Sequence, residues 1–165
     1  MNIIVNQNTL TFAGKTYACA IGKGGYTRDK REGDGATPEG VFSLRECWYR
    51  PDKLAAPQTT LTVHAISPLD GWCDAPISPE YNRLVTLPYP HSHERMWRED
   101  GVYDVVVPLG YNDAPAIPGK GSAIFLHVAK PDFSDTEGCV ALALPDLLEI
   151  LAKIDLTSQI DTRQS

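Results

Sequence analysis

Short apolar runs, separated by polar residues, Gly and Pro, dominate the pattern along this chain. Most runs alternate between apolar and polar positions and are rich in β-branched and aromatic residues, which is typical of strands. These runs are NIIV, LTFAG, TYACAIG, GVFSLRECWY, TLTVHAI, VYDVVVPLGY and AIFLHV. Residues 6–8, Asn-Gln-Asn, predict a hairpin turn between the first two runs. The pattern therefore predicts a mostly β fold.

Only the segment PDLLEILAKI, residues 145–154, has helical spacing. By the i, i+3, i+4, i+7 rule, one apolar face forms, and it consists of Leu147, Leu148, Leu151 and Ile154. Pro145 suits the first turn of a helix. We expect one short C-terminal helix directly after a strand that begins at Cys139, and a final short strand in SQIDT.

The middle of the chain, residues 50–100, is irregular and rich in Pro, but it also holds Trp, Tyr and three of the four His residues. A disordered segment would be poor in aromatic residues. We therefore expect ordered loops or a small subdomain that builds a pocket over the β scaffold. The length of 165 residues predicts a single domain, residues 1–165, with one hydrophobic core.

Charge and hydropathy narrow the choice of partners. The formal net charge is -6, and the densest basic run, TRDKR at 27–31, is flanked by acidic residues. This excludes a nucleic-acid surface, which needs clustered Lys and Arg. No run approaches the about 18 apolar residues of a membrane span. The N-terminus has only Ile3 to Val5 as an apolar run and no basic residue before it, so we expect a cytoplasmic protein without membrane partners, and a monomer.

The sequence offers little for a cofactor or a metal. The spacings of Cys19, Cys47, Cys73 and Cys139 fit no zinc pattern. GKGG and PGKGS lack the spacing of a phosphate-binding loop. The pair His91 and His93 has no clear third ligand. We therefore expect no metal and no cofactor. Cys19 and Cys47 fit small buried hydrophobic residues, whereas Cys73 lies in a loop-like stretch.

The stretch HVAKPDFSDTEGCVAL, residues 127–142, could carry chemistry. If the runs ending at His127 and beginning at Cys139 are neighbouring strands, the imidazole could act as base for a thiol nucleophile. An imidazolium there would lower the thiol pKa. Gly138 allows a tight turn that leaves backbone N–H groups free for an oxyanion. The same spacing also fits a buried His and a buried Cys in the core, and spacing alone does not decide between the two.

Two motifs resemble the YkuD-type L,D-transpeptidases. HVAKPDFSDTEGCVAL is similar to the active-site signature of that family, and GDGATPEGVFSL at 33–44 resembles its T-P-x-G-x-[FY] strand. The resemblance implies a β-sandwich or open barrel with a short helix. It implies Cys139 as nucleophile, His127 as base and then acid, the Val128 carbonyl as the group orienting His127, and the N–H groups of Gly138 and Cys139 as the oxyanion hole.

The chain departs from the common family pattern around the cysteine. Glu137 replaces a His, Ala141 replaces an Arg suited to a substrate carboxylate, and the loop from His to Cys is shorter. We expect Glu137 to turn away from the sulfur or to meet a cation, and we take it as a contact for a substrate ammonium.

Another cation should then bind the substrate carboxylate. The candidates are Arg83, Arg95 and Arg98, with Arg95 first, because a guanidinium pairs with a carboxylate through two bonds. HSHERMWRED followed by YDVVVPLGYND resembles a more distant branch of the family, in which an extended loop precedes the catalytic strands. The resemblance thus adds four substrate-binding candidates, which are His91, Met96, Trp97 and Tyr111.

The expected cytoplasmic location favours one activity over another. A cross-linking transpeptidase works on the assembled wall, whereas a cytoplasmic member would meet soluble muropeptides from wall turnover. We therefore expect an L,D-carboxypeptidase that removes the terminal D-alanine from diaminopimelate-containing tetrapeptides in peptidoglycan recycling. The alternatives are an L,D-transpeptidase and a non-catalytic muropeptide-binding module.

Overall fold

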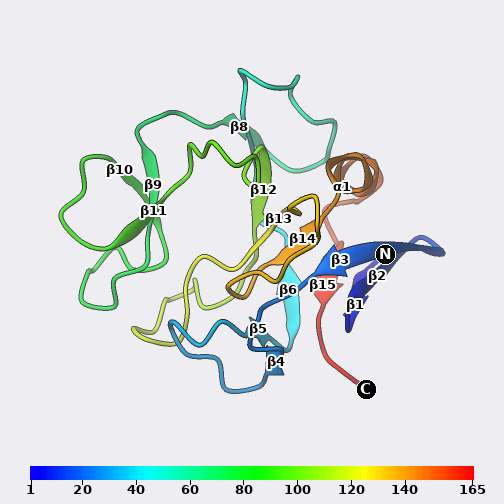
Figure 1. The fold of residues 1–165 in the computed structure, drawn as a ribbon, viewed down its shortest axis with the longest axis horizontal. Coiled ribbons are helices and arrows are strands. Elements are labelled where there is room, and N and C mark those ends of the chain that lie inside the picture. Colours follow the sequence, from blue (N-terminus) through cyan, green and yellow to red (C-terminus); the bar gives the residue numbers. More distant parts are fainter.

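The computed structural model describes residues 1–165. It has 33% of its residues in strands and 5% in a helix, which confirms the expected mostly β fold. One ten-stranded sheet curls into a half-barrel (Figure 1). In spatial order its strands are β6 (Val41–Ser43), β15 (Gln159–Asp161), β1 (Ile3–Asn6), β2 (Thr9–Phe12), β3 (Lys15–Ala20), β14 (Val140–Leu142), β13 (Phe125–Val128), β12 (Val105–Pro108), β7 (Cys47–Tyr49) and β8 (Val63–Ala65).

The two termini meet at one end of this sheet. β1 and β2 form the expected hairpin, with Asn6 paired to Thr9, and alternate residues of both strands are buried. The expected last strand is also present, because β15 lies parallel to β1 with Ile160 opposite Ile3. The run GVFSLRECWY divides into two strands, β6 and β7, which are first and ninth in the strand order, and Leu44 between them bridges to Leu109 directly after β12.

The helix α1 (Leu144–Leu151) covers one face of the sheet beside β13. It begins with a Pro in its first turn, as the sequence predicts, and buries Leu147, Ile150 and Leu151 in the larger hydrophobic core. Leu148 is only half-buried, because the helix presents Ile150 to the sheet instead. No helix has the length and apolar character needed to cross a membrane.

A second, smaller sheet stands beside the half-barrel, seen in green in Figure 1. It consists of β10 (Leu84–Thr86), β9 (Asp70–Cys73) and β11 (His93–Arg95). The expected ordered subdomain in the middle of the chain is thus confirmed. Cys73, expected in a loop, is fully buried in β9. A two-stranded sheet of β4 (Tyr26–Thr27) and β5 (Thr37–Pro38) completes the fold.

The centre of the large sheet separates two cores. Leu126 of β13 and Val140 of β14 belong to the larger core under α1. Phe125 and Cys139 belong to a smaller core on the opposite face, together with Met96 from the segment after β11. Side chains alternate along a strand, so every second position of β13 and β14 faces the small sheet rather than the helix.

Candidate active site

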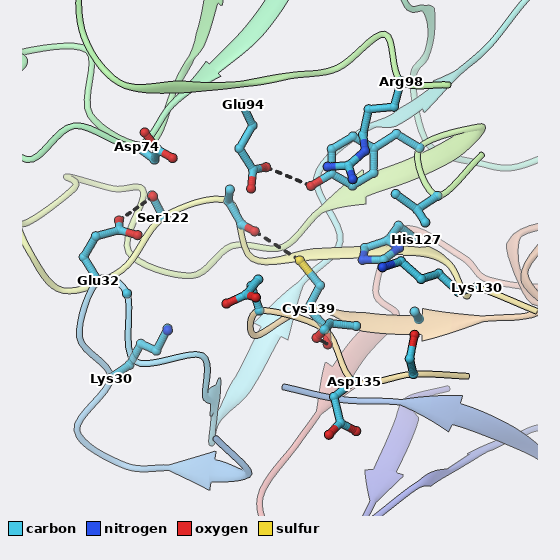
Figure 2. A pocket seen from close by; sticks show the side chains of 18 residues that line it. Lys30, Glu32, Asp74, Glu94, Arg98, Ser122, His127, Lys130, Asp135 and Cys139 are labelled. Atoms are coloured by element: carbon cyan, nitrogen blue, oxygen red, sulfur yellow. Dashed lines mark hydrogen bonds between the residues drawn. The ribbon is translucent and has the colours of Figure 1, made fainter. Parts of the chain in front are cut away.

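A pocket of about 320 Å³ opens between the centre of the large sheet and the small sheet. His127 from β13 and Cys139, directly before β14, both line it (Figure 2). β13 and β14 are neighbours, as expected, and they run parallel, a direction that the sequence did not predict, with His127 opposite Ala141. Cys139 precedes Ala141 by two positions, so it lies on the same face of the sheet as the imidazole.

Two backbone groups hold the sulfur of Cys139, whose residue is only 7% exposed. The N–H of Phe125 donates to Sγ at 3.3 Å, and the thiol donates to the carbonyl of Ala123 at 3.2 Å. Burial raises the pKa of the thiol to about 12, and the nearby Glu94 carboxylate acts in the same direction. The cysteine is therefore a neutral thiol held in one position.

His127 is oriented by its own strand. Its Nδ1 lies 2.9 Å from the Val128 carbonyl, which can only accept, so Nδ1 carries the hydrogen and Nε2 has a free lone pair. Burial, helped by the charges of Arg98 and Lys130, lowers the pKa of the imidazole to about 4, against the opposing effects of the Val128 hydrogen bond and of Asp100. At neutral pH this His is an uncharged proton acceptor.

The structure corrects the expected charge state of this pair. The sequence suggested an imidazolium that lowers the thiol pKa, but burial acts on both groups in the opposite sense. Neither charged form is favoured at these two buried positions. Cys139 and His127 are thus a neutral pair, and the thiol proton has to move to the imidazole as the sulfur attacks.

The backbone around the cysteine offers one free donor for an oxyanion. The N–H of Gly138 donates to the Thr136 hydroxyl at 3.1 Å, and this hydroxyl donates to the Cys139 carbonyl at 2.7 Å. The N–H of Cys139 donates to no side chain and to no loop carbonyl. Of the two expected donors, only that of Cys139 is free in this structure.

The two sequence motifs meet next to the cysteine. Gly22 forms an isolated bridge with Thr136, and its N–H donates to the buried Thr37 hydroxyl at 2.9 Å. The carbonyl of Ala36 lies against Gly138, where it would be 2.8 Å from an added Cβ. The ATPEG segment, residues 36–40, therefore shapes the turn that presents Cys139.

Comparison with known proteins agrees with this geometry. The family model for YkuD, the L,D-transpeptidase catalytic domain, matches residues 2–161. The chain belongs to the YkuD family. No curated protein sequence matches it.

Among solved structures, this YkuD domain is similar to the crystal structure of the helical cell shape determining protein Pgp2 from Campylobacter jejuni, with 14% identity and a TM-score of 0.47. The similarity covers 99% of this chain and 48% of that one, so the chain spans about half the length of that protein.

The walls of the pocket carry charges of both signs (Figure 2). Glu94 accepts from Tyr103 at 2.8 Å, and Glu32 accepts from Tyr81 at 2.6 Å, but these carboxylates and that of Asp74 form no salt bridge. One Asp74 oxygen is buried without any hydrogen bond. Burial raises the pKa of Glu94, and the charges of Asp74 and Glu32 add to the rise.

Two cations of the pocket, Arg98 and Lys130, lie near His127, whereas Lys30 lies beside Glu32 (Figure 2) and pairs with Asp34. Arg98 forms a salt bridge with Asp100 at 2.6 Å. Its guanidinium lies 5.0 Å from the ring centre of Tyr103, and the Tyr103 ring packs edge-on against the His127 ring. Lys130, in the loop directly after β13, is exposed and has no ion-pair partner. Lys130 is therefore the pocket cation most available to an incoming carboxylate.

Glu137 meets a cation, one of the two outcomes expected from the sequence. Its carboxylate is 2.9 Å from the Lys23 ammonium, and its side chain is 75% exposed at the rim of the pocket. A substrate ammonium would have to compete with Lys23 for this carboxylate.

Most of the other residues predicted to bind substrate lie outside this pocket. Arg83 lines a separate pocket, and Arg95 and His91 are exposed. Met96 is buried in the smaller core, and the Trp97 ring lies 3.7 Å under the Arg50 guanidinium. Tyr111 donates to the Lys120 carbonyl at 2.6 Å. The assignment of these six residues to the substrate gains no support from the pocket, whereas Arg98, the third arginine considered, lines it.

Strand alternation explains what the sequence reasoning missed. In β11 the side chain of Glu94 faces the pocket, so that of the next residue, Arg95, faces solvent. The sequence placed no strand there, so it could not tell which neighbour points inward. Lys130 could have been found from its position three residues after His127. No group of three or more His, Cys, Asp or Glu side chains is arranged to hold a metal ion.

Proposed function

We propose that this YkuD domain is a cytoplasmic cysteine L,D-carboxypeptidase. It would remove the terminal D-alanine from diaminopimelate-containing muropeptide tetrapeptides in peptidoglycan recycling. The observation that carries the proposal is the neutral Cys139 and His127 pair facing one pocket whose walls carry both charge signs. A muropeptide end is itself rich in charges of both signs, with free carboxylates and the side-chain ammonium of diaminopimelate.

The proposed reaction has two stages. The sulfur of Cys139 attacks the carbonyl carbon between diaminopimelate and D-alanine while its proton passes to Nε2 of His127. The free N–H of Cys139 faces the developing oxyanion. The intermediate collapses, the C–N bond breaks, and His127 gives its proton to the leaving amine. Water then attacks the thioester, loses a proton to His127, and releases the tripeptide as the proton returns to sulfur.

The charge layout suggests the direction of the bound peptide. The leaving D-alanine must lie on the His127 side, because His127 protonates its amine. Lys130 and Arg98 are the cations on that side, and both influence the pKa of His127. The opposite wall carries Glu32, Asp74 and Glu94, and its cation Lys30 is paired with Asp34, so this wall suits an ammonium group on the acyl side.

The size of the pocket favours water as the acceptor. About 320 Å³ lies at the lower end of the range for small-ligand sites. Such a volume has room for one peptide end, whereas transpeptidation needs a second stem peptide beside the acyl-enzyme. The second candidate is nevertheless an L,D-transpeptidase, because the family match is to the transpeptidase catalytic domain. A non-catalytic muropeptide-binding module is the third, and the intact pair of Cys139 and His127 speaks against it.

One experiment separates the three functions. The protein is incubated with disaccharide tetrapeptide, with and without a D-amino-acid acceptor, and the products are followed by mass spectrometry. Tripeptide in both samples supports the carboxypeptidase, and exchanged tetrapeptide supports the transpeptidase. Binding without any product supports the binding module. Cys139→Ala should abolish both reactions, and activity that survives this change would overturn the mechanism. Fractionation of cells tests the cytoplasmic location.

A further inference from the structure

One buried amide connects the small sheet to the nucleophile. Asn82 lies in the segment between β9 and β10, and it is 6% exposed. Its Oδ1 accepts from the Trp72 indole N–H at 2.9 Å and from the Ala123 N–H at 3.0 Å. Its Nδ2 donates to the carbonyls of Tyr111 and Asn112 at 3.1 and 2.9 Å. Both donors and both lone pairs of this amide are therefore in use.

Ala123 is the residue through which this amide reaches the active site. Its N–H is held by Asn82, and its carbonyl accepts from the thiol of Cys139 at 3.2 Å. Ala123 has a φ of 54°, in the left-handed region. This conformation costs a residue with a Cβ about 1–2 kcal/mol, so the surroundings have to impose it. Two side-chain hydrogen bonds hold Ala123, one from its N–H to Asn82 and one from the Cys139 thiol to its carbonyl, and only the bond to Asn82 comes from outside the catalytic pair.

We propose that Asn82 is a positioning residue for the nucleophile, because it fixes Ala123 so that the Ala123 carbonyl holds the thiol of Cys139 in one orientation. This inference deepens the proposed function and rests on Cys139 being its nucleophile. The sulfur lies between a donor, the Phe125 N–H, and an acceptor, the Ala123 carbonyl. The acceptor stabilises the protonated thiol and would repel a thiolate, so it keeps the proton on sulfur until a substrate arrives.

A purely structural role for Asn82 is the alternative, and the chain offers a matched control. Asn112 is also an asparagine in the left-handed region, with a φ of 49° against 59° for Asn82. Its side chain donates to the carbonyls of Ile117 and Gly121 at 3.0 and 2.9 Å and accepts from the Ile117 N–H at 2.8 Å. It holds the neighbouring loop in a similar way but has no bond to Ala123.

The test compares three variants. Asn82→Gly and Asn112→Gly keep a residue that tolerates positive φ and remove only the amide. Asn82→Asp keeps an oxygen that can accept from Ala123. The rate at which iodoacetamide alkylates Cys139 is measured against pH, by mass spectrometry of the Cys139 peptide, together with melting temperature, kcat and KM. The other groups facing the sulfur, which are Glu94, Lys30, Arg98, Tyr103 and His127, stay unchanged in all three.

We expect Asn82→Gly to raise the alkylation rate of Cys139 at pH 8 at least fivefold, because the thiol loses its acceptor. Its kcat should fall at least tenfold with KM within twofold. Asn82→Asp should stay closer to the wild type in alkylation. Asn112→Gly should lower the melting temperature but leave the alkylation profile unchanged. Equal alkylation changes in both Gly variants, or none in either, would overturn the proposal.

A milder variant keeps the proposal testable if Asn82→Gly does not fold. Trp72→Phe removes the indole N–H that also holds Oδ1 of Asn82, while an aromatic ring still packs against Phe125. It should also raise the alkylation rate of Cys139, by a smaller factor than Asn82→Gly. An unchanged rate would contradict the positioning role of Asn82. Alkylation needs no substrate, so its result stands even if the carboxypeptidase activity is not found.

Discussion

The carbonyl oxygen of Ala36 lies 2.8 Å from the position that a Cβ atom on Gly138 would take. Gly138 also has a φ of 137°, a backbone conformation that residues with side chains rarely adopt. Gly138→Ala should therefore displace either the ATPEG segment, residues 36–40, or the turn that presents Cys139. We expect a loss of about 1–3 kcal/mol in the free energy of unfolding, measured by denaturant titration, and at least a tenfold lower kcat.

Gly14→Ala is the matched control for this change. Gly14 also has a positive φ, of 77°, but no atom lies within 4 Å of an added Cβ. It stands between β2 and β3, away from the pocket. This variant should lose about 1 kcal/mol from backbone strain alone and keep its kcat. A Gly138→Ala protein as active as this control would show that the turn tolerates a side chain.

The activity should depend on pH in an unusual way. His127 must be neutral to accept the thiol proton, and burial lowers its pKa to about 4. Because a depressed pKa keeps the base neutral to lower pH, kcat/KM should be retained below pH 6 and fall only as pH approaches 4. The thiol pKa of about 12 predicts no rise from thiol ionisation between pH 6 and 10. An acid limb near the ordinary His value of about 6.5 would contradict the neutral pair.

The strands around the catalytic pair could be predicted because their signals are local. The run ending at His127 is apolar and β-branched, and the hairpin at residues 6–8 has a turn sequence, so both appear in the structure as expected. The helix after β14 was found from its spacing. The contact between β13 and β14 also followed from a loop between two apolar runs, but the parallel direction of the two strands did not.

The pocket walls could not be predicted in the same way. β9, β10 and β11 are only three or four residues long, and β9 and β11 carry Gly, Asp or charged residues. Such strands are specified by pairing with neighbours rather than by their own pattern. Without the register, the inward side of β11 was unknown, and Arg95 was chosen instead of Glu94. Burial of Cys139 and His127 is likewise a property of the assembled fold. The direction of their pKa shifts therefore could not be predicted from the sequence.

We expect Lys130, and not Arg95, to bind the carboxylate of the substrate. Lys130 lines the pocket without an ion-pair partner, whereas Arg95 is exposed outside it. Lys130→Gln should raise KM for the tetrapeptide about fivefold, since a charged hydrogen bond contributes about 1 kcal/mol or more. Arg95→Gln should leave KM unchanged. Steady-state kinetics with a tetrapeptide amidated at its C-terminus give the control, because that substrate should not respond to Lys130→Gln. The opposite ranking of the two variants would return the carboxylate site to Arg95.

Glu137 and Lys23 provide a pair of changes with opposite expected signs. The two side chains are 75% and 58% exposed, so their mutual salt bridge is worth at most about 1 kcal/mol. If Glu137, rather than the wall of Glu32, Asp74 and Glu94, binds the ammonium of diaminopimelate, Lys23 competes with the substrate for the same carboxylate. Glu137→Gln should then raise KM for amine-bearing peptides, and Lys23→Gln should lower it about two- to fivefold. A peptide whose side-chain amine is acetylated should show neither change. Because both variants break the same salt bridge, an equal effect of the two on KM would mean that Glu137 only pairs with Lys23 and does not bind the substrate.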